Sequence, residues 1–156
     1  MSRYGGFRPT DEVHAARETT VDYTNVLNAR IVVFQCPAFL TPTDKNIENL
    51  RRFFIRAHRE AKHLLLAWKP RGPWPDLLIK TLCQELRLIH AVGPFLGRPL
   101  SSEFRYFRLH GIRGYKYAYS DADLDHLSEW CRTDSYVMFN NITMAQDALG
   151  FGSRFQ

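Results

Sequence analysis

Long apolar runs are missing from this sequence. No stretch approaches the roughly 20 residues that a membrane-spanning helix requires. The first residues, MSRYGGFRPTDEV, include no apolar segment of the kind found in secretory signal peptides. We therefore expect a protein without a membrane span that is located in the cytoplasm.

Cysteine is scarce as well. Cys36, Cys83 and Cys131 lie far apart in the chain, and no two of them have the CxxC spacing of a zinc or redox site. An odd number of cysteines without an export signal is typical of free thiols in a reducing compartment. We predict neither a disulfide framework nor a metal site, and no feature of the sequence indicates a cofactor.

The motifs of several large enzyme classes are absent. There is no P-loop, no GxGxxG between a strand and a helix, and no HExxH. Carboxylates, which serve as metal ligands and general bases, are nearly missing from the predicted strand ends. This absence argues against a complete catalytic site and leaves open whether the protein is an enzyme.

What remains is a basic chain of ordinary globular composition. Its 156 residues carry a net charge of +5 and a sequence pI of about 9.3. This length fits one domain over residues 1–156. The charge permits contact with phosphate groups or nucleic acid without requiring it. The basic side chains at 51–62 lie on a predicted helix, where a solvated outer face explains them.

Short apolar runs alternate with helical patterns along the chain. The runs predict strands at 31–34, 63–68, 88–92, 105–109 and 135–139. The helices are expected over about 10–27, 44–60 and 75–85, from Ser120 onward, and from Thr143 to about Gly150. This order predicts an α/β protein made of five parallel β/α units.

Helix ends and helix faces can also be predicted. Thr10, Thr43 and Ser120 are expected N-caps, and Asn28 is an expected C-terminal cap. Three helices carry stripes at helical spacing. They are Val13, Ala16, Thr20 and Tyr23 in the first helix, Ile47, Leu50, Phe53, Phe54 and Ala57 in the second, and Leu77, Leu78, Leu82 and Leu86, expected to be buried, in the third.

Polar residues follow these strands at their carboxyl ends. Right-handed crossovers place the ends of parallel strands on one side of a sheet. The residues expected at this common rim are Gln35, Lys69, Arg71, His110, Asn140 and Asn141.

The fourth strand carries an unusual pair. In RYFRLHG, the two-residue period places Tyr106, Arg108 and His110 on one face. A cation and a histidine on an otherwise apolar strand favour a site for an anion or phosphate, with His110 as a catalytic acid or base. The alternative is a structural arginine paired with a buried acid.

Further candidates flank this strand. Asn140 and Asn141 would orient a substrate or cap the following turn. In WKPRGPW, Lys69 and Arg71 are interleaved with tryptophans, which suits phosphate binding or base stacking; the alternative is a packed loop. Tyr117, in the aromatic segment after the fourth strand, completes the candidate ligand-binding residues.

Several of these motifs together resemble the YecE-like family, a family of unknown function also called domain of unknown function seventy-two. The motifs are FQCP with PTxxN, YFRLHG followed by YSDADL, and YVMFNN followed by a helix with Asp147-Ala148. The opening GGFRPTDEV is similar to archaeal-type members. The resemblance implies a TIM-barrel-like fold, of which this chain would form the C-terminal five of eight β/α units.

The resemblance also bears on function. Arg71, Arg108, His110, Gly111, Asn140 and Asn141 match the family pattern. Lys69 and Gly93 stand where the family often has an acid, which puts catalysis in doubt.

Two functions therefore remain open. The first is binding of an anionic ligand, a phosphate or nucleic acid, at the rim of the barrel by a degenerate or incomplete hydrolase. Its substrates would be phosphate esters or nucleic acid. The second is a non-catalytic module that binds nucleic acid or a partner chain. Open barrel edges invite pairing, so we expect self-association or a complementary chain.

Overall fold

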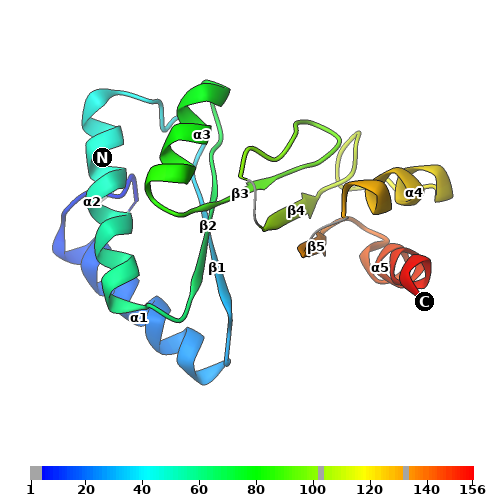
Figure 1. Cartoon of the computed structure of the whole chain (residues 1–156), viewed down its shortest axis with the longest axis horizontal. Coiled ribbons are helices and arrows are strands. Elements are labelled where there is room, and N and C mark those ends of the chain that lie inside the picture. Colours follow the sequence, from blue (N-terminus) through cyan, green and yellow to red (C-terminus); the bar gives the residue numbers. More distant parts are fainter. Residues whose placement is uncertain (1–4, 102–103, 132–133) are drawn as a thin grey trace. The chain divides into compact units, whose positions relative to one another are not determined.

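Helices and strands alternate along most of the chain, and the third strand is followed by the fourth strand rather than by a helix, as Figure 1 shows. The computed structural model describes residues 5–101, 104–131 and 134–156. The chain divides into two compact units, Met1–Ile89 and His90–Gln156. Within the described residues, no helix is both long and apolar enough to cross a membrane.

Unit 1 contains three helices and two strands. They are α1 (Asp11–Val26), β1 (Ile31–Gln35), α2 (Asp44–Glu60), β2 (Leu65–Lys69) and α3 (Asp76–Glu85). Unit 2 contains the remaining elements, with the first residue of β3 at the boundary. They are β3 (Ile89–Val92), β4 (Arg105–Leu109), α4 (Asp121–Trp130), β5 (Ser135–Phe139), α5 (Met144–Gly152) and a 3₁₀ turn, η1 (Ser153–Phe155).

All the described strand pairings are parallel: β1 with β2, β3 with β4, and β4 with β5. The predicted fold class, an α/β partial barrel of five parallel strands with alternating helices, is therefore confirmed. Strand β2 begins at Leu65, two residues later than predicted, because a turn closed by the bond from Leu64 N–H to Ala61 O precedes it. The single domain over residues 1–156 stays a prediction.

Helix α2 covers the β1–β2 pair with an aromatic cluster. Phe34 of β1 meets Phe53 and Phe54 of α2 edge to face, with ring centroids 5.3 and 5.2 Å apart. Leu50 and Phe54 are fully buried. The 3.6-residue period of α2 places these side chains on one face, as expected.

Helix α1 presents a different face from the predicted one. Of the predicted stripe, Val13 is buried, but Ala16 is exposed and Tyr23 is 64% exposed. Arg17 faces inward instead: it is 4% exposed, forms an ion pair with Glu60 at 2.6 Å and lies 5.8 Å from the Phe53 ring. A bidentate contact to a carboxylate, combined with an aromatic face, orients a helix more strongly than a small alanine does.

The prediction for α3 was wrong at one position. Leu77 is 76% exposed, whereas Ile79, Leu82, Cys83 and Leu86 are buried. Positions 79, 82, 83 and 86 follow the spacing of one helical face, and Leu77 lies outside that face. Several leucines in a short helix satisfy two overlapping stripes, so composition alone did not distinguish them.

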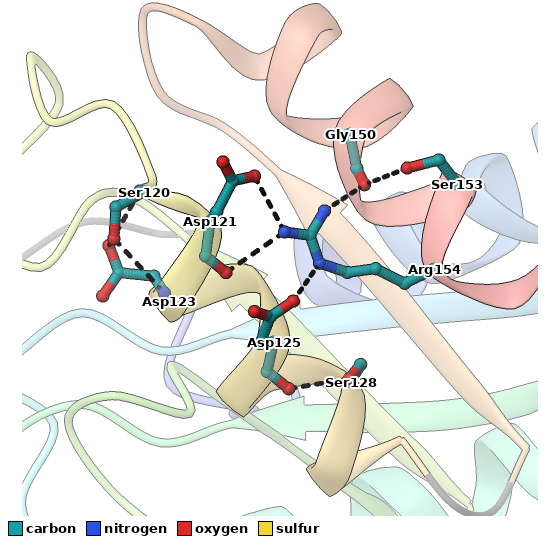
Figure 2. Close-up of polar contacts among 8 residues, drawn as sticks. All are labelled: Ser120, Asp121, Asp123, Asp125, Ser128, Gly150, Ser153 and Arg154. Atoms are coloured by element: carbon teal, nitrogen blue, oxygen red, sulfur yellow. Dashed lines mark hydrogen bonds and ion pairs between the residues drawn. The ribbon is translucent and has the colours of Figure 1, made fainter.

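Unit 2 has a core of its own beneath α4 and α5. Its buried members are Phe107, Leu109, Tyr119, Leu124, Leu127 and Phe151. Arg154 ties the C-terminal segment to α4, as Figure 2 shows: its guanidinium lies 2.9 Å from Asp121 and 2.7 Å from Asp125. The core and these ion pairs hold the helices of the unit against its strands.

Each predicted cap is present. The side chains of Thr10, Thr43 and Ser120 accept backbone N–H bonds in the first turns of α1, α2 and α4. Ser120 forms a capping box with Asp123. Asn28 lies just beyond α1 with a φ of 49°, the left-handed conformation that terminates a helix.

Replacing Ser120 by alanine should lower the free energy of unfolding by about 1 kcal/mol, because the first turn of α4 loses its acceptor. The matched control is Ser128→Ala in the same helix, whose hydroxyl bonds only the Asp125 carbonyl. Urea unfolding followed by circular dichroism measures both. Equal effects of the two substitutions would contradict a specific role for the cap.

Candidate functional site

The most organised candidate site lies at the carboxyl ends of β4 and β5. Leu109 and Phe139 are register partners, and the ladder continues one step further, with Asn140 N–H donating to Leu109 O at 2.8 Å. This last bond brings the residues that follow the two strands side by side. The Nδ2 of Asn140 lies 2.9 Å from Nδ1 of His110.

This contact selects a tautomer of the imidazole. An amide nitrogen donates and does not accept, so Nδ1 of His110 must be the acceptor in the contact. The proton of the neutral ring then resides on Nε2, which becomes a directed donor. His110 is half-buried and Asn140 is exposed, so a ligand has access to the pair.

Arg108 lies on the same strand face as His110. The residues on either side of Arg108, Phe107 and Leu109, are 0% and 1% exposed and pack in the core beneath the helices. Alternation along a strand therefore directs Arg108 to the opposite face, which it shares with Tyr106. Burial raises the pKa of Tyr106, and the nearby charge of Arg108 partly opposes this rise.

A tight turn follows His110 immediately. Gly111 has a φ of +84°, and a Cβ atom built on it would lie 2.1 Å from the carbonyl oxygen of Gly114. Its N–H donates to the hydroxyl of Tyr119 at 2.9 Å. Burial is the main cause that raises the pKa of Tyr119 to about 12, so the acceptor stays protonated. The backbone after His110 therefore requires glycine.

Asn141, the neighbour of Asn140, has a different environment. It is fully buried, and its Nδ2 donates to the carbonyl of Tyr117 at 2.7 Å and to Oδ2 of Asp147 at 2.6 Å. The same Asp147 oxygen accepts from Thr143 Oγ1 at 2.8 Å. This network joins the start of α5 to the loop after β4. Asn141 therefore stabilises the loop that follows His110.

Tyr117 faces the start of α4. Its hydroxyl donates to Asp123 Oδ2 at 2.8 Å, and this bond is the main cause that raises the pKa of Tyr117. Burial opposes ionisation of Asp123. Hydrogen bonds from the Ser120 N–H, the Ser120 hydroxyl and the Tyr117 hydroxyl outweigh it and lower the pKa of Asp123.

A second group of predicted residues lies in unit 1. Gln35 and Lys69 are register partners at the ends of β1 and β2, and Arg71 is exposed in the loop that follows. A Cβ on Gly72 would lie 2.3 Å from Ala38 O, so this loop packs closely on the loop after β1. The Trp74 indole N–H donates to Leu40 O at 2.7 Å and strengthens this contact.

The structure thus forms two groups from the predicted residues. Arg108, His110 and Asn140 lie together in unit 2, with Asn141 and Tyr117 in the supporting network. Gln35, Lys69 and Arg71 belong to unit 1. A rim common to both groups stays a prediction, as do the roles of the individual residues.

Sequence reasoning missed the supporting polar residues. Thr143, Asp147 and Tyr119 were not proposed as parts of the site. Asp147, four residues after Thr143, is an acid in the first turn of a helix, which reads as an ordinary helix start. Its contact with Asn141 spans six residues and its contact with the backbone of Tyr119 spans 28, and no local spacing rule predicts either of them.

The described residues offer little to a metal ion. Across 5–101, 104–131 and 134–156, no three His, Cys, Asp or Glu side chains lie close enough together to bind one. All three cysteines are free, and burial raises the pKa of Cys36 to about 11 and that of Cys83 to about 12. Both thiols are therefore protonated at neutral pH.

Comparison with known proteins places the fold. No protein-family model matches the sequence, and no curated protein matches it. Two solved structures are similar, both DUF72 family proteins. The match to the protein from Enterococcus faecalis V583 has a TM-score of 0.66 at 17% sequence identity. It covers 93% of this chain and 66% of the Enterococcus protein.

The match to the second protein, from Thermotoga maritima MSB8, has a TM-score of 0.61 at 19% sequence identity. It covers 90% of this chain and 65% of the Thermotoga protein. This chain thus spans slightly less than two thirds of either protein. At such low identity, the likeness shows that the three proteins share a fold.

Replacing Gly111 by alanine should lower the free energy of unfolding by more than about 2 kcal/mol, since backbone strain and a clash with the Gly114 carbonyl combine. Gly114→Ala is the matched control. Gly114 has a φ of +105°, but a Cβ there would meet nothing within 4 Å. Chemical unfolding of both variants measures the difference. A control as destabilised as Gly111→Ala would contradict the proposed close approach.

The capping box should contribute a pH-dependent term to stability. The pKa of Asp123 is lowered from 3.8 in the folded state. Its stabilisation is therefore fully present above about pH 3.8 and is lost as the pH falls through the lower folded value. The difference in unfolding free energy between the wild type and Asp123→Asn should shrink below pH 3.8. Tyr117→Phe, which removes one donor, should show a smaller effect, and a pH-independent difference would contradict this assignment.

Proposed function

We propose that this chain is a YecE-like protein of the DUF72 family that binds phosphate-bearing anions at the carboxyl ends of β4 and β5. The fold likeness supports the family, together with the RLHG and FNN motifs at the two strand ends. The observation that carries the ligand class is the contact between Asn140 and His110, with Arg108 on the same strand face.

Each group would have a distinct role in this site. Arg108 supplies a permanent positive charge and a planar set of donors suited to phosphate oxygens. His110 directs its Nε2–H toward the ligand, because Asn140 occupies Nδ1. In a hydrolase, the same ring nitrogen would pass a proton to the leaving group. The Asn140 NH2 group donates one hydrogen to the histidine and can orient a ligand oxygen with its second hydrogen.

The remaining predicted residues have supporting roles in this proposal. Lys69, Arg71 and Gln35, which belong to unit 1, would form a second group that contacts phosphates or bases. Asn141 and Tyr117 would hold the loop behind His110 through Asp147 and Asp123.

Several finer predictions belong to the same proposal. The chain would be an archaeal-type member, would correspond to the last five of eight barrel units and would act in the cytoplasm. A degenerate or incomplete hydrolase is the reaction class that fits. Self-association, or pairing with a complementary chain, stays a prediction.

Isothermal titration of the full chain with phenyl phosphate and with a single-stranded DNA dodecamer tests the site. Both probes share the phosphate group, and only the dodecamer offers several phosphates and bases. Arg108→Gln should weaken binding by about tenfold or more, as expected for a lost charge-assisted contact. Lys116→Gln is the charge-matched control from an exposed loop position of the same unit and should change binding less than about threefold.

The outcomes separate the functions. Turnover of a phosphate ester that His110→Ala abolishes would identify a hydrolase, whereas salt-dependent DNA binding without turnover would identify a binding module. Absence of binding to both probes, or equal affinities of Arg108→Gln and the wild type, would contradict the proposed site.

A further inference from the structure

We propose that unit 1 contains a docking groove for an extended apolar peptide segment, which would add a parallel strand to the edge of β1 that faces away from β2. The groove lies between α1 and β1, and Phe7, Val13, Ala16, Thr20, Val33 and Phe53 contribute to its lining. We call it the α1–β1 groove. All its lining residues belong to unit 1, whereas Arg108, His110 and Asn140 of the anion site belong to unit 2.

The backbone of β1 is the first argument. Among the described strands, β1 pairs only with β2. Cys36 N–H donates to Lys69 O, and Arg30 O accepts from Leu65 N–H. In a parallel ladder, alternate residues bond to the same neighbour. The even-numbered residues of β1 therefore face β2, and the N–H and C=O groups of Ile31 and Val33 point to the opposite edge.

The exposed face of α1 is the second argument. Ala16 and Thr20, part of the stripe at helical spacing in α1, line the groove. Further along the helix, Tyr23 is 64% exposed. The volume of the groove, about 320 Å³, falls within the range of pockets that hold ligands, roughly 300–1,000 Å³. An apolar helix face beside an open strand edge matches a segment that offers both backbone hydrogen bonds and apolar side chains.

The position of α1 selects an extended segment over a second copy of this chain. Helices α1 and α2 lie on the same side of the β1–β2 pair, joined by the Arg17–Glu60 ion pair (Figure 1). A strand of a second copy would bring its own covering helix to this side, where α1 already stands. A bare extended segment avoids this collision.

The test uses the full chain and a fluorescein-labelled peptide with the sequence of residues 60–69, EAKHLLLAWK. Its last five residues form β2, which already pairs in parallel with β1. Fluorescence anisotropy should show saturable binding. A peptide of reversed sequence and identical composition should bind at least about tenfold more weakly, since apolar contact alone does not reproduce the backbone register.

Two variants block the groove in different ways. Ala16→Trp fills it from the helix, and its matched control is Ala15→Trp, at the neighbouring exposed position of α1 that does not line the groove. Val33→Pro removes one edge N–H and leaves the β2 ladder intact. We expect Ala16→Trp and Val33→Pro each to weaken binding by about tenfold or more, and Ala15→Trp to leave it unchanged.

Amide hydrogen exchange gives an independent readout. Peptide binding should slow exchange at Ile31 and Val33, whose N–H groups face the edge, and leave Val32 and Phe34 unchanged. The inference is overturned if no saturable binding occurs, if Ala16→Trp binds as tightly as Ala15→Trp, or if the reversed peptide binds equally well. Light scattering that finds a dimer dissociated by Ala16→Trp would also overturn it, because the occupant would then be a second copy.

Discussion

The parallel ladder between β4 and β5 is the constraint on which the candidate site depends. It aligns Leu109 with Phe139 and continues through the Asn140 N–H, so that the first residues beyond both strands must lie side by side. A shift of one residue in this register would turn Arg108 into the core and Phe107 out of it. The buried aromatic and aliphatic side chains of β4 therefore fix the direction of its polar ones.

The ladder between β4 and β5 alone does not fix the position of His110, because the chain leaves the strand in a sharp turn directly after this residue. Gly111 makes the turn possible, and the Asn141–Asp147 network holds the returning loop from behind. The Asn141 Nδ2 is paired in this network, whereas its buried Oδ1 has no hydrogen-bond partner among the described residues. An unpaired buried group costs about 1–3 kcal/mol, which offsets part of the gain from the network. The adjacent asparagines thus divide their tasks: the buried Asn141 stabilises the loop, and the exposed Asn140 remains available for a ligand.

Much of this arrangement could be predicted from the sequence, because it depends on local patterns. Short apolar runs and capping residues such as Thr43 and Ser120 can be recognised within a few neighbouring positions. The predicted strand and helix starts agree with the structure to within two residues. The contact between His110 and Asn140 required only the additional rule that parallel strand ends meet. The contacts of Asp147 with the Tyr119 backbone and of Asn141 with the Tyr117 carbonyl could not be predicted, since the partners are 28 and 24 residues apart and follow no spacing rule.

The two wrong helix faces have different causes. In α3, leucines on overlapping stripes made the choice ambiguous, and Leu77 was assigned to the wrong one. In α1, the stripe with Ala16 and Thr20 is real, but the helix is oriented by the contacts of Arg17 with Glu60 and Phe53. The apolar pattern of this stripe predicts a covered helix face, but the described fold leaves the face uncovered. Such disagreements between local sequence and fold are expected at functional sites. Because this stripe borders an open strand edge, the conflict in α1 points to an interaction with another segment, whereas the one in α3 requires no partner.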